Sequence, residues 1–489
     1  MCKTQSMKNT TEEIEHYRCL IPSGLDLLNI TQQNPPDFEA DLGLLHYLVH
    51  LTIEVPARNK DLLTKTGYVP FKAGILQSKS RMYRQHLDYL VEQGVLDEDR
   101  QYRVGKHCRH FRIAERYLSN RLKEFAITDT KMLKVLERHS NIDFDATIKY
   151  KKLYQWFDGS RLKVDVQAAE AYIWAELAHN KRESYYEAYI TAYTKILKVR
   201  MIDEGAFWFN VDDFGHRLHT NLTNLDKCLK PFITFDGLNL VSVDVKNSQP
   251  FFSLKIFQGR NNTTNTLTYH LSSQPTSLST NPTSHNECRE SIMIVKGGES
   301  LDNTGISSYR GEVVRGTLYE FLASEMRKEF GEDYFTKTYY DVSKGRVVES
   351  PPPPRQRVKG VLYQVFFSKN SSHSREKDLF RRLFPDVMRV FEEYKGNIHI
   401  PVHNRHKKLA KELQRIESGV MLDKVVKEIS RLRPDLPIFT IHDCIVTTVG
   451  NEEFIQQVMK QVITAAMGFA PPMKTEYWCR DCSPMKLVA

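Results

Sequence analysis

The fold is decided by the stretch Pro437-Ile438-Phe439-Thr440-Ile441-His442-Asp443-Cys444-Ile445-Val446-Thr447-Thr448. Apolar and β-branched residues stand on both sides of the pair His442-Asp443, which predicts two short strands joined by a charged turn. A carboxylate among apolar neighbours is costly unless something pairs with it, and a metal ion is the usual partner. Taken alone, the stretch also fits a buried hairpin that merely has a polar tip.

A second aspartate ends another apolar strand far upstream, where Leu240 to Val243 lead into Asp244. Two aspartates at neighbouring strand ends would hold two divalent ions, which is the requirement for in-line phosphoryl transfer with a pyrophosphate leaving group. Mg²⁺ suits an all-oxygen site that keeps waters and substrate phosphates, with Mn²⁺ as an alternative. We therefore expect Asp244 and Asp443 to be metal ligands and catalytic residues.

A third segment places two cations and two aromatic residues at intervals of four: Arg355, Lys359, Tyr363 and Phe367. On a helix these side chains share one face. The cations could hold a triphosphate and the aromatic rings could stack on a base. The alternative is an amphipathic core helix whose cations reach out to solvent. The four prolines of 351–354 predict a break with a new element just beyond it.

The order of these segments resembles the family A DNA polymerases and their relatives, the single-subunit phage-type RNA polymerases. That family's first catalytic motif begins with a strand-end Asp, as at Asp244, and its last motif is a His-Asp hairpin, as at His442 and Asp443. Its fingers helix carries Arg, Lys and an aromatic residue at the spacing of Arg355, Lys359 and Tyr363. The resemblance implies an α+β right-hand polymerase with a palm, fingers and thumb-like helices.

The resemblance also implies roles for individual residues. Arg355 and Lys359 would hold the incoming triphosphate, Lys359 would protonate the pyrophosphate, and Tyr363 and Phe367 would face the nascent base pair. Arg217-Leu218-His219-Thr220 with Asn224-Leu225 is similar to the family's Arg-Leu-Ser-Ser…Asn-Leu-Gln segment, and Leu413 to Val426 is similar to the helix before the His-Asp hairpin. The nucleic-acid contacts implied in this way are Arg217, Asn224, Gln414, Glu417 and His442.

Several positions depart from the family pattern. Cys444 replaces the Glu that follows His-Asp in most DNA-polymerising members, and Gln364 and Phe367 replace a Gly and a Tyr. Gln249 stands where the DNA polymerases place a Glu that excludes the ribose 2′-hydroxyl, and its similar volume still predicts a steric gate. These departures leave the choice of sugar open. No acidic pattern typical of an exonuclease precedes the palm, so we expect no proofreading domain.

The N-terminal third contains a different pattern. An amphipathic helix is predicted from Ser78 to Gln93, followed by Gly94 and by strands near Val95-Leu96, Tyr102–Val104 and His110–Ile113. This order resembles a winged helix-turn-helix, in which a helix lies in a nucleic-acid groove. Arg81 and Arg84 would then contact nucleic acid. Such domains also serve purely as packing or protein-contact modules.

Composition sets the remaining expectations. The 489 residues suffice for two to four domains, and 69 Lys+Arg against 60 Asp+Glu give a net charge of +9, which is compatible with a nucleic-acid partner. We expect no membrane span, no signal segment and, from 8 scattered cysteines, a cytoplasmic protein. The expected division is a tail (1–44), a winged-helix-like domain (45–118), a helical thumb-like region (119–206), palm (207–256), a flexible insertion (257–309), fingers (310–400) and palm (401–489).

Three functions are compatible with these patterns. The first is a template-dependent DNA polymerase that binds a DNA primer-template and deoxynucleoside triphosphates. The second keeps the fold but makes RNA, or adds nucleotides without a template. The third is a non-catalytic DNA-binding replication or regulatory protein that uses the winged helix alone.

Overall fold

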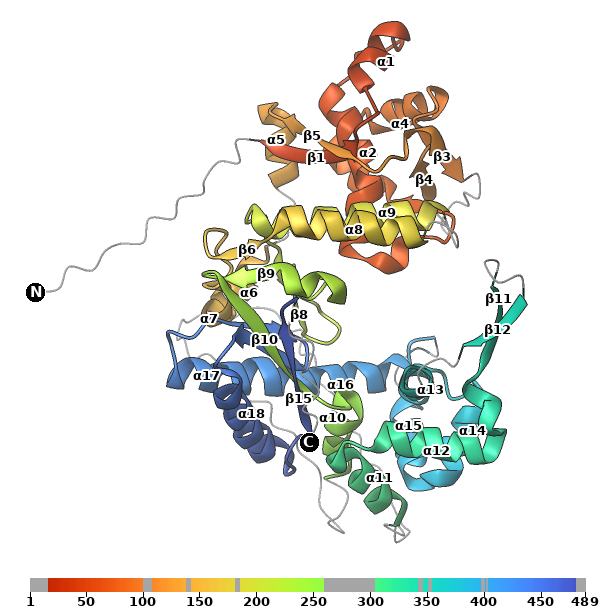
Figure 1. Cartoon of the computed structure of the whole chain (residues 1–489), viewed down its shortest axis with the longest axis vertical. Helices are drawn as coiled ribbons and strands as arrows, with labels where there is room; N and C mark the ends of the chain where they lie inside the picture. Colours follow the sequence, from red (N-terminus) through yellow and green to blue (C-terminus); the bar gives the residue numbers. More distant parts are fainter. Residues whose placement is uncertain are drawn as a thin grey trace, which may run out of the picture.

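The computed structural model describes residues 16–99, 108–137, 142–180, 185–258, 304–341, 346–350, 354–396, 401 and 403–480. Helices and strands both contribute, as the sequence predicts for an α+β protein. Figure 1 shows the N-terminal elements at the top, the main sheet below them, and α11 to α15 at the lower right. Within the described ranges, no helix is long and apolar enough to cross a membrane.

The main sheet is built around β10 (Leu238–Val245), a β-branched, apolar strand whose residues 240–243 are buried. It pairs antiparallel with β14 (Cys444–Thr448) on one side and β15 (Met473–Trp478) on the other. β13 (Ile438–Ile441) extends the sheet beyond β14, and β9 (Ile233–Phe235) and β6 (Leu162–Val164) extend it at the other end. The predicted strands beside His442-Asp443 and before Asp244 are thus confirmed.

Helices cover this sheet. α10 (Ser248–Phe257) follows β10 directly and packs against α16 (Lys407–Val420). α16 continues through a π-helical turn (Met421–Val425) into α17 (Val426–Leu432), while α18 (Glu452–Met467) packs against β10 and β14. A π turn inserts an extra residue into a helix and is frequent at functional sites. This π turn follows α16 directly, beginning at Met421.

A helical unit with a hairpin lies beside the sheet. It contains α11 (Thr304–Arg315), α12 (Leu318–Phe330), η4 (Glu332–Phe335), β11 (Lys337–Asp341), β12 (Arg346–Ser350), α13 (Pro354–Phe367), α14 (Arg375–Leu383) and α15 (Pro385–Lys395). In α13 the buried residues Val358, Val361, Leu362 and Val365 follow helical spacing, whereas Arg355, Lys359 and Tyr363 are exposed on another face. The predicted helix after the prolines is confirmed.

The predicted insertion 257–309 lies mostly outside the described residues, which resume at 304. Its two ends differ from that prediction. Phe257 is the buried last residue of α10, and Ile306 and Tyr309 are buried in α11. These aromatic and apolar side chains belong to the core, so both ends of the predicted insertion are part of the folded protein.

The N-terminal unit contains α2 (Leu42–Arg58), α3 (Ala73–Lys79) and α4 (Tyr83–Glu92) against a sheet of order β2-β4-β3 (Val69–Phe71, Arg109–Ile113 and Leu96–Asp99). The single helix predicted from Ser78 to Gln93 is wrong at its start, because Ser80 has an extended backbone that ends α3. The strand predicted at Tyr102–Val104 lies outside the described residues.

The irregular tail predicted for 1–44 is wrong over its described part. β1 (Tyr17–Pro22) pairs with β5 (Leu122–Ile127), and α1 (Leu27–Gln33) follows. Cys19, Leu20 and Ile21 are all buried, so the strand completes the core of the unit. The helical region expected for 119–206 therefore begins with a strand, which follows a 3₁₀ turn (Glu115–Tyr117).

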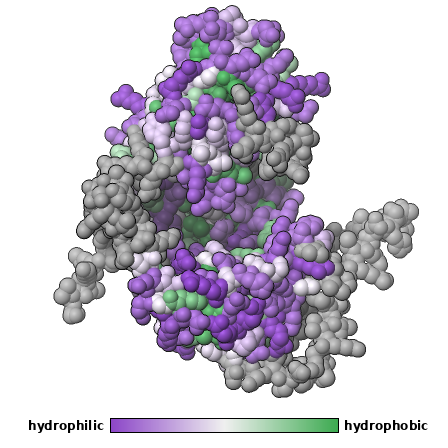
Figure 2. All heavy atoms as spheres, turned by 90° about the vertical axis from the view of Figure 1, so that its right-hand side faces the viewer, coloured by the Kyte–Doolittle hydropathy of each residue, from purple (hydrophilic) through white to green (hydrophobic). Residues whose placement is uncertain are grey.

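Two long helices join this unit to the sheet. α8 (Val166–Asn180) and α9 (Tyr185–Asp203) pack on each other, and α9 also packs on α2. Smaller elements complete the connection: η1 (Lys60–Leu62), α5 (Thr130–Glu137), α6 (Phe144–Lys149), α7 (Lys151–Tyr154), β7 (Phe209–Val211), β8 (Leu218–Thr220) and η3 (Lys227–Phe232). Figure 2 shows the surface deeply hollowed between the upper and the lower part of the molecule.

Candidate active site

The two predicted aspartates lie side by side on the main sheet. Asp244 is paired with Cys444 in the antiparallel register of β10 and β14, and the amide of Val245 donates to the carbonyl of Asp443 at 3.3 Å. The tight turn at His442-Asp443 therefore brings Asp443 next to the end of β10. Burial and the repulsion of Glu417 and Asp244 raise the pKa of Asp443 well above its ordinary value, although a hydrogen bond with Ser248 acts against this shift.

A third carboxylate, Glu417, approaches this pair from α16. It is 1% exposed and accepts hydrogen bonds from Arg217 (Nε at 2.9 Å, Nη2 at 2.5 Å) and from Nε2 of Gln249 at 2.5 Å. Burial raises the pKa of Glu417, while Arg217 and Gln249 oppose the rise. Glu417 and Arg217 were predicted to contact nucleic acid; here each binds the other, inside the carboxylate cluster.

Gln249 is held by this contact. Its Nε2 is directed to Glu417, and its buried Oε1 has no hydrogen-bond partner among the described residues. The side chain therefore has a fixed orientation beside the two aspartates, as a residue that limits the shape of a substrate would need. Its predicted role as a sugar gate remains a prediction.

His442 occupies the turn with a left-handed backbone, φ 56°. Burial and the positive charge of Arg217 and His219 lower the pKa of His442 to about 4, so the imidazole is neutral at pH 7. Its ring lies 5.7 Å from that of His219, whose Nε2 is 3.0 Å from Asp212 Oδ2. Buried Nδ1 of His442 has no partner within the described part of the chain.

The exposed face of α13 reaches the carboxylate cluster through Arg355. The guanidinium of Arg355 donates to Asn247 Oδ1 at 3.3 Å and to Glu320 Oε1 at 2.9 Å, and lies 4.5 Å from the ring centre of Tyr319. Since Asn247 is only three residues after Asp244, this contact joins the N-terminal end of α13 to the carboxylate cluster.

The other predicted members of the face follow along α13. Lys359 Nζ lies 5.6 Å from the ring centre of Tyr363, and the rings of Tyr363 and Phe367 are 5.5 Å apart. Tyr363 is 45% exposed, so its ring is available to a ligand. The four side chains predicted to share a face do so.

Three neighbours of the site are not found by the sequence patterns. Tyr319 lies under Arg355, and burial raises the pKa of its phenol to about 12. Asn247 adopts a left-handed backbone, φ 54°, and its buried Nδ2 has no partner in the described residues. Lys474 of β15 forms an ion pair with Asp244, Nζ to Oδ2 3.0 Å. Only Asn247 has a local signal, because Asn is favoured where the backbone turns left-handed between a strand and a helix.

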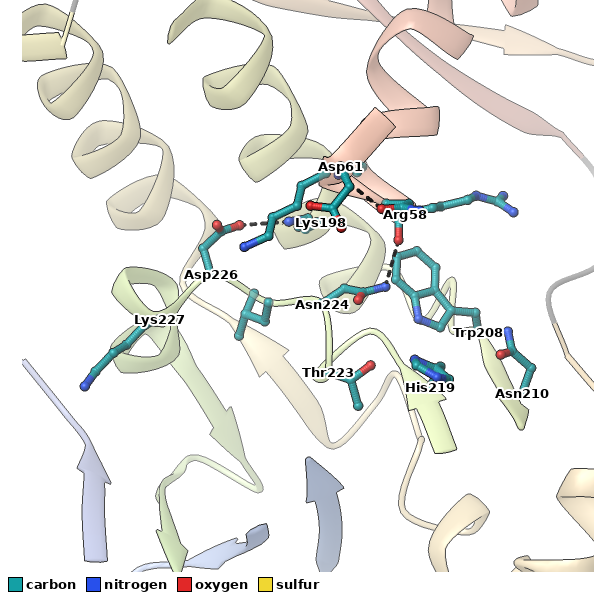
Figure 3. Close-up of a pocket in the computed structure, with 14 residues that line it drawn as sticks. Arg58, Asp61, Lys198, Trp208, Asn210, His219, Thr223, Asn224, Asp226 and Lys227 are labelled. Atoms are coloured by element: carbon teal, nitrogen blue, oxygen red, sulfur yellow. Dashed lines mark hydrogen bonds and ion pairs between the residues drawn. The ribbon is translucent and has the colours of Figure 1, made fainter. Parts of the chain in front are cut away.

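The remaining predicted contacts lie around the cluster. Gln414 of α16 packs against Gly215 so closely that a Cβ at Gly215 would stand 2.4 Å from Gln414 Oε1, which explains the glycine. Asn224 donates to the carbonyl of Arg58 at 3.2 Å and lines a pocket with a volume of about 640 Å³ between η1, α9 and β8 (Figure 3). The pocket also contains the ion pair of Lys198 with Asp226, 2.8 Å long.

Arg81 and Arg84 lie far from this cluster in sequence, the first just before α4 and the second in its first turn. Both are exposed and neither makes an ion pair with another described residue. By contrast, Arg109 pairs with Glu98 (2.6 Å) and Asp88 (2.8 Å), and Arg112 pairs with Asp97 (2.9 Å). Among these arginines, Arg81 and Arg84 are the ones free to bind a phosphate.

The donor set fits a hard divalent ion only in part. Asp443 has no cationic partner within the described residues, and its pKa is raised first by burial and then by the neighbouring charges of Glu417 and Asp244. Yet no group of three or more His, Cys, Asp or Glu side chains is arranged to hold a metal in the ranges that the structure describes. An ion held by Asp244 and Asp443 would therefore need ligands from substrate or water, as Mg²⁺ commonly does.

The structure is thus a mixed α+β protein in which three carboxylates, one of them buried, gather at the ends of two central strands. A helix with exposed cations and aromatic rings lies next to them. No protein-family model and no curated protein matches the sequence. Among solved structures, the polymerase domain of Pol1 from M. smegmatis, in complex with DNA primer-template and dNTP, is similar at 12% identity with a TM-score of 0.38. The match covers 64% of this chain and 56% of that chain, a weak likeness in part of the fold.

Proposed function

We propose that the chain is a template-dependent nucleotidyltransferase that extends a primer, with DNA polymerase activity on dNTPs as its main reaction. The observation that carries the proposal is the meeting of Asp244 and Asp443 on adjacent strands, opposite the Arg355 end of α13. Phosphoryl transfer needs negative ligands for cations on one side and positive charge for the triphosphate on the other. The site provides both, drawn from segments far apart in the sequence.

Each group has a defined task in this proposal. Asp244 and Asp443 would hold two Mg²⁺ ions, which supply charge stabilisation for the attacking and leaving oxygens. Arg355 and Lys359 bind the triphosphate, and Lys359 donates a proton to the leaving pyrophosphate. Tyr363 and Phe367 stack on the new base pair. Neutral His442 orients Asp443, and Gln249, fixed by Glu417, crowds the 2′ position of the sugar.

The proposal assigns the parts of the molecule as well. The main sheet with α10 and α16 to α18 is the palm, α11 to α15 the fingers, and α8 and α9 thumb-like helices. The N-terminal unit is a winged helix that holds duplex through Arg81 and Arg84; the sheet order β2-β4-β3 with three helices supports this assignment. Arg217, Asn224 and Gln414 lie between these parts and would follow the primer-template.

Primer extension tests the proposal. Purified protein is incubated with a labelled primer-template, Mg²⁺ and either four dNTPs or four rNTPs. We expect extension with dNTPs that is lost, by at least about a hundredfold, in Asp443→Asn. Extension that persists in Asp443→Asn contradicts the metal assignment.

The same assay separates the other functions. Extension with rNTPs alone assigns RNA synthesis, and extension of a primer without template assigns untemplated addition. Gln249→Ala should increase rNTP use if Gln249 crowds the 2′ position. If no substrate is extended by wild type but duplex is bound, the protein is a DNA-binding replication or regulatory protein that uses the N-terminal unit alone.

A further inference from the structure

Asp244 already has a cation beside it. Lys474 stands directly opposite Asp244 in the antiparallel register of β10 and β15, which places both side chains on the same face of the sheet. Lys474 Nζ lies 3.0 Å from Asp244 Oδ2. We propose that Lys474 is a built-in counter-ion of Asp244 that a divalent ion must displace, so that it sets the ion affinity of the site; this rests on the proposed function.

The distribution of charge around the aspartates supports this role. Three carboxylates meet here, and two of them have their own cation: Glu417 has Arg217 and Asp244 has Lys474. Asp443 has none within the described chain. A divalent ion that enters between Asp244 and Asp443 therefore finds one carboxylate oxygen already bound to an ammonium group, and the two cations compete for it.

The two internal cations differ in their freedom to leave. The side chain of Arg217 is 20% exposed and makes two hydrogen bonds to a carboxylate that is 1% exposed. If Arg217 left, Glu417 would remain as an uncompensated buried charge, which is strongly unfavourable. Lys474 is 49% exposed and makes one ion pair among the described residues, so its flexible side chain can turn into solvent without opening a cavity. Lys474 is thus the counter-ion that can give way.

The sheet provides a matched control. Lys227 pairs with Glu476, two residues beyond Lys474 on the same strand, with Nζ to Oε1 2.9 Å. It is 78% exposed and its partner is not part of the carboxylate cluster. Lys227→Met removes the same charge from the same region of the surface as Lys474→Met, and methionine keeps the length and the apolar stem of the side chain.

The test measures Mn²⁺ binding to the full chain without DNA or nucleotide, from the electron paramagnetic resonance signal of free Mn²⁺. An exposed ion pair contributes about 0.4–1 kcal/mol, in the upper part of the usual range, so Lys474→Met should bind Mn²⁺ about two- to fivefold more tightly than wild type. Lys227→Met and the charge-conserving Lys474→Arg should bind as wild type does. Lys474→Gln gives a second neutral variant if the methionine variant does not fold.

Each outcome decides the matter. Equal or weaker binding by both neutral variants of Lys474 overturns the proposal, and an equal gain in Lys227→Met overturns it as well, because general surface charge would then be the cause. If wild type binds Mn²⁺ and Asp443→Asn does not, the metal assignment stands whatever Lys474 does. If no protein binds Mn²⁺, the counter-ion role fails, and the metal-dependent function is decided by the primer-extension assay with Asp443→Asn.

Discussion

At the scale of single residues, His442 controls how the turn at the site responds to acid. Its folded pKa is about 4, because burial and the nearby charges of Arg217 and His219 disfavour the imidazolium, whereas an unfolded chain has the ordinary value of about 6.5. Between these two pH values the unfolded state binds a proton that the folded state does not bind. The contribution of His442 to the free energy of unfolding is therefore fully present above pH 6.5 and is lost as the pH falls towards 4. The shift corresponds to roughly 3 kcal/mol.

His442→Asn tests this dependence, because asparagine tolerates the left-handed backbone that the turn requires. The free energy of unfolding in urea is compared at pH 7 and pH 4.5. We expect the stability of wild type relative to the variant to fall by a few kcal/mol on acidification. Asp443, whose pKa is raised, contributes the opposite slope in both proteins. Equal slopes in wild type and variant would contradict the assignment; exposed His373→Asn is the control.

At the scale of elements, one buried lysine holds the C-terminal end of α13 and a second holds the loop that follows it. Lys395 Nζ donates to the carbonyl of Val365 at 2.7 Å, and Lys377 Nζ donates to the carbonyls of Lys369 and Ser372 at 3.0 and 2.8 Å. Cations stabilise the negative end of a helix dipole. Burial, helped by the charge of Lys377, lowers the pKa of Lys395 to about 8. The helix that carries Arg355 and Tyr363 is thus held at its far end.

Lys395→Met should free that end, because the carbonyls of the last turn lose their donor. We expect faster amide hydrogen exchange for residues near the C-terminus of α13, measured by mass spectrometry. Lys328→Met removes an exposed lysine of α12 that pairs with Glu325, and should leave this exchange unchanged. If Lys395→Met and Lys328→Met exchange these amide hydrogens at the same rate, apolar packing alone holds the helix.

Some elements of the fold can be predicted from the sequence and others cannot. The strands beside His442-Asp443, the strand before Asp244 and the face of α13 all follow from local periodicity, and the structure confirms them. The pairing of Glu417 with Arg217 has no local signal, since it joins α16 to the turn before β8, 200 residues away in the chain. β1 was missed because its apolar residues stand in a polar stretch and its pairing partner, β5, follows about a hundred residues later.

At the scale of the whole molecule, the net charge of +9 does not show which cations bind nucleic acid, because many of them already form ion pairs with carboxylates. Arg112 shows this: it pairs with Asp97 and also lies 3.7 Å from the ring centre of Tyr186, so it joins the N-terminal unit to α9. Replacing Arg112 should therefore lower the stability of the folded protein and leave its affinity for DNA unchanged. Free, exposed cations such as Arg81 and Arg84 are the ones that can release counter-ions from DNA.

The double variant Arg81→Gln/Arg84→Gln should therefore bind duplex DNA more weakly, with a salt dependence of the logarithm of affinity that is less steep by about 2. Fluorescence anisotropy over a series of salt concentrations measures both quantities. Lys424→Gln/Lys460→Gln removes two exposed cations from the π turn and α18, on the other side of the main sheet from the N-terminal unit (Figure 1), and has the same net charge. If the two double variants lose affinity equally, the overall charge attracts DNA. A loss confined to the first variant places the duplex on the N-terminal unit, as the proposed function requires.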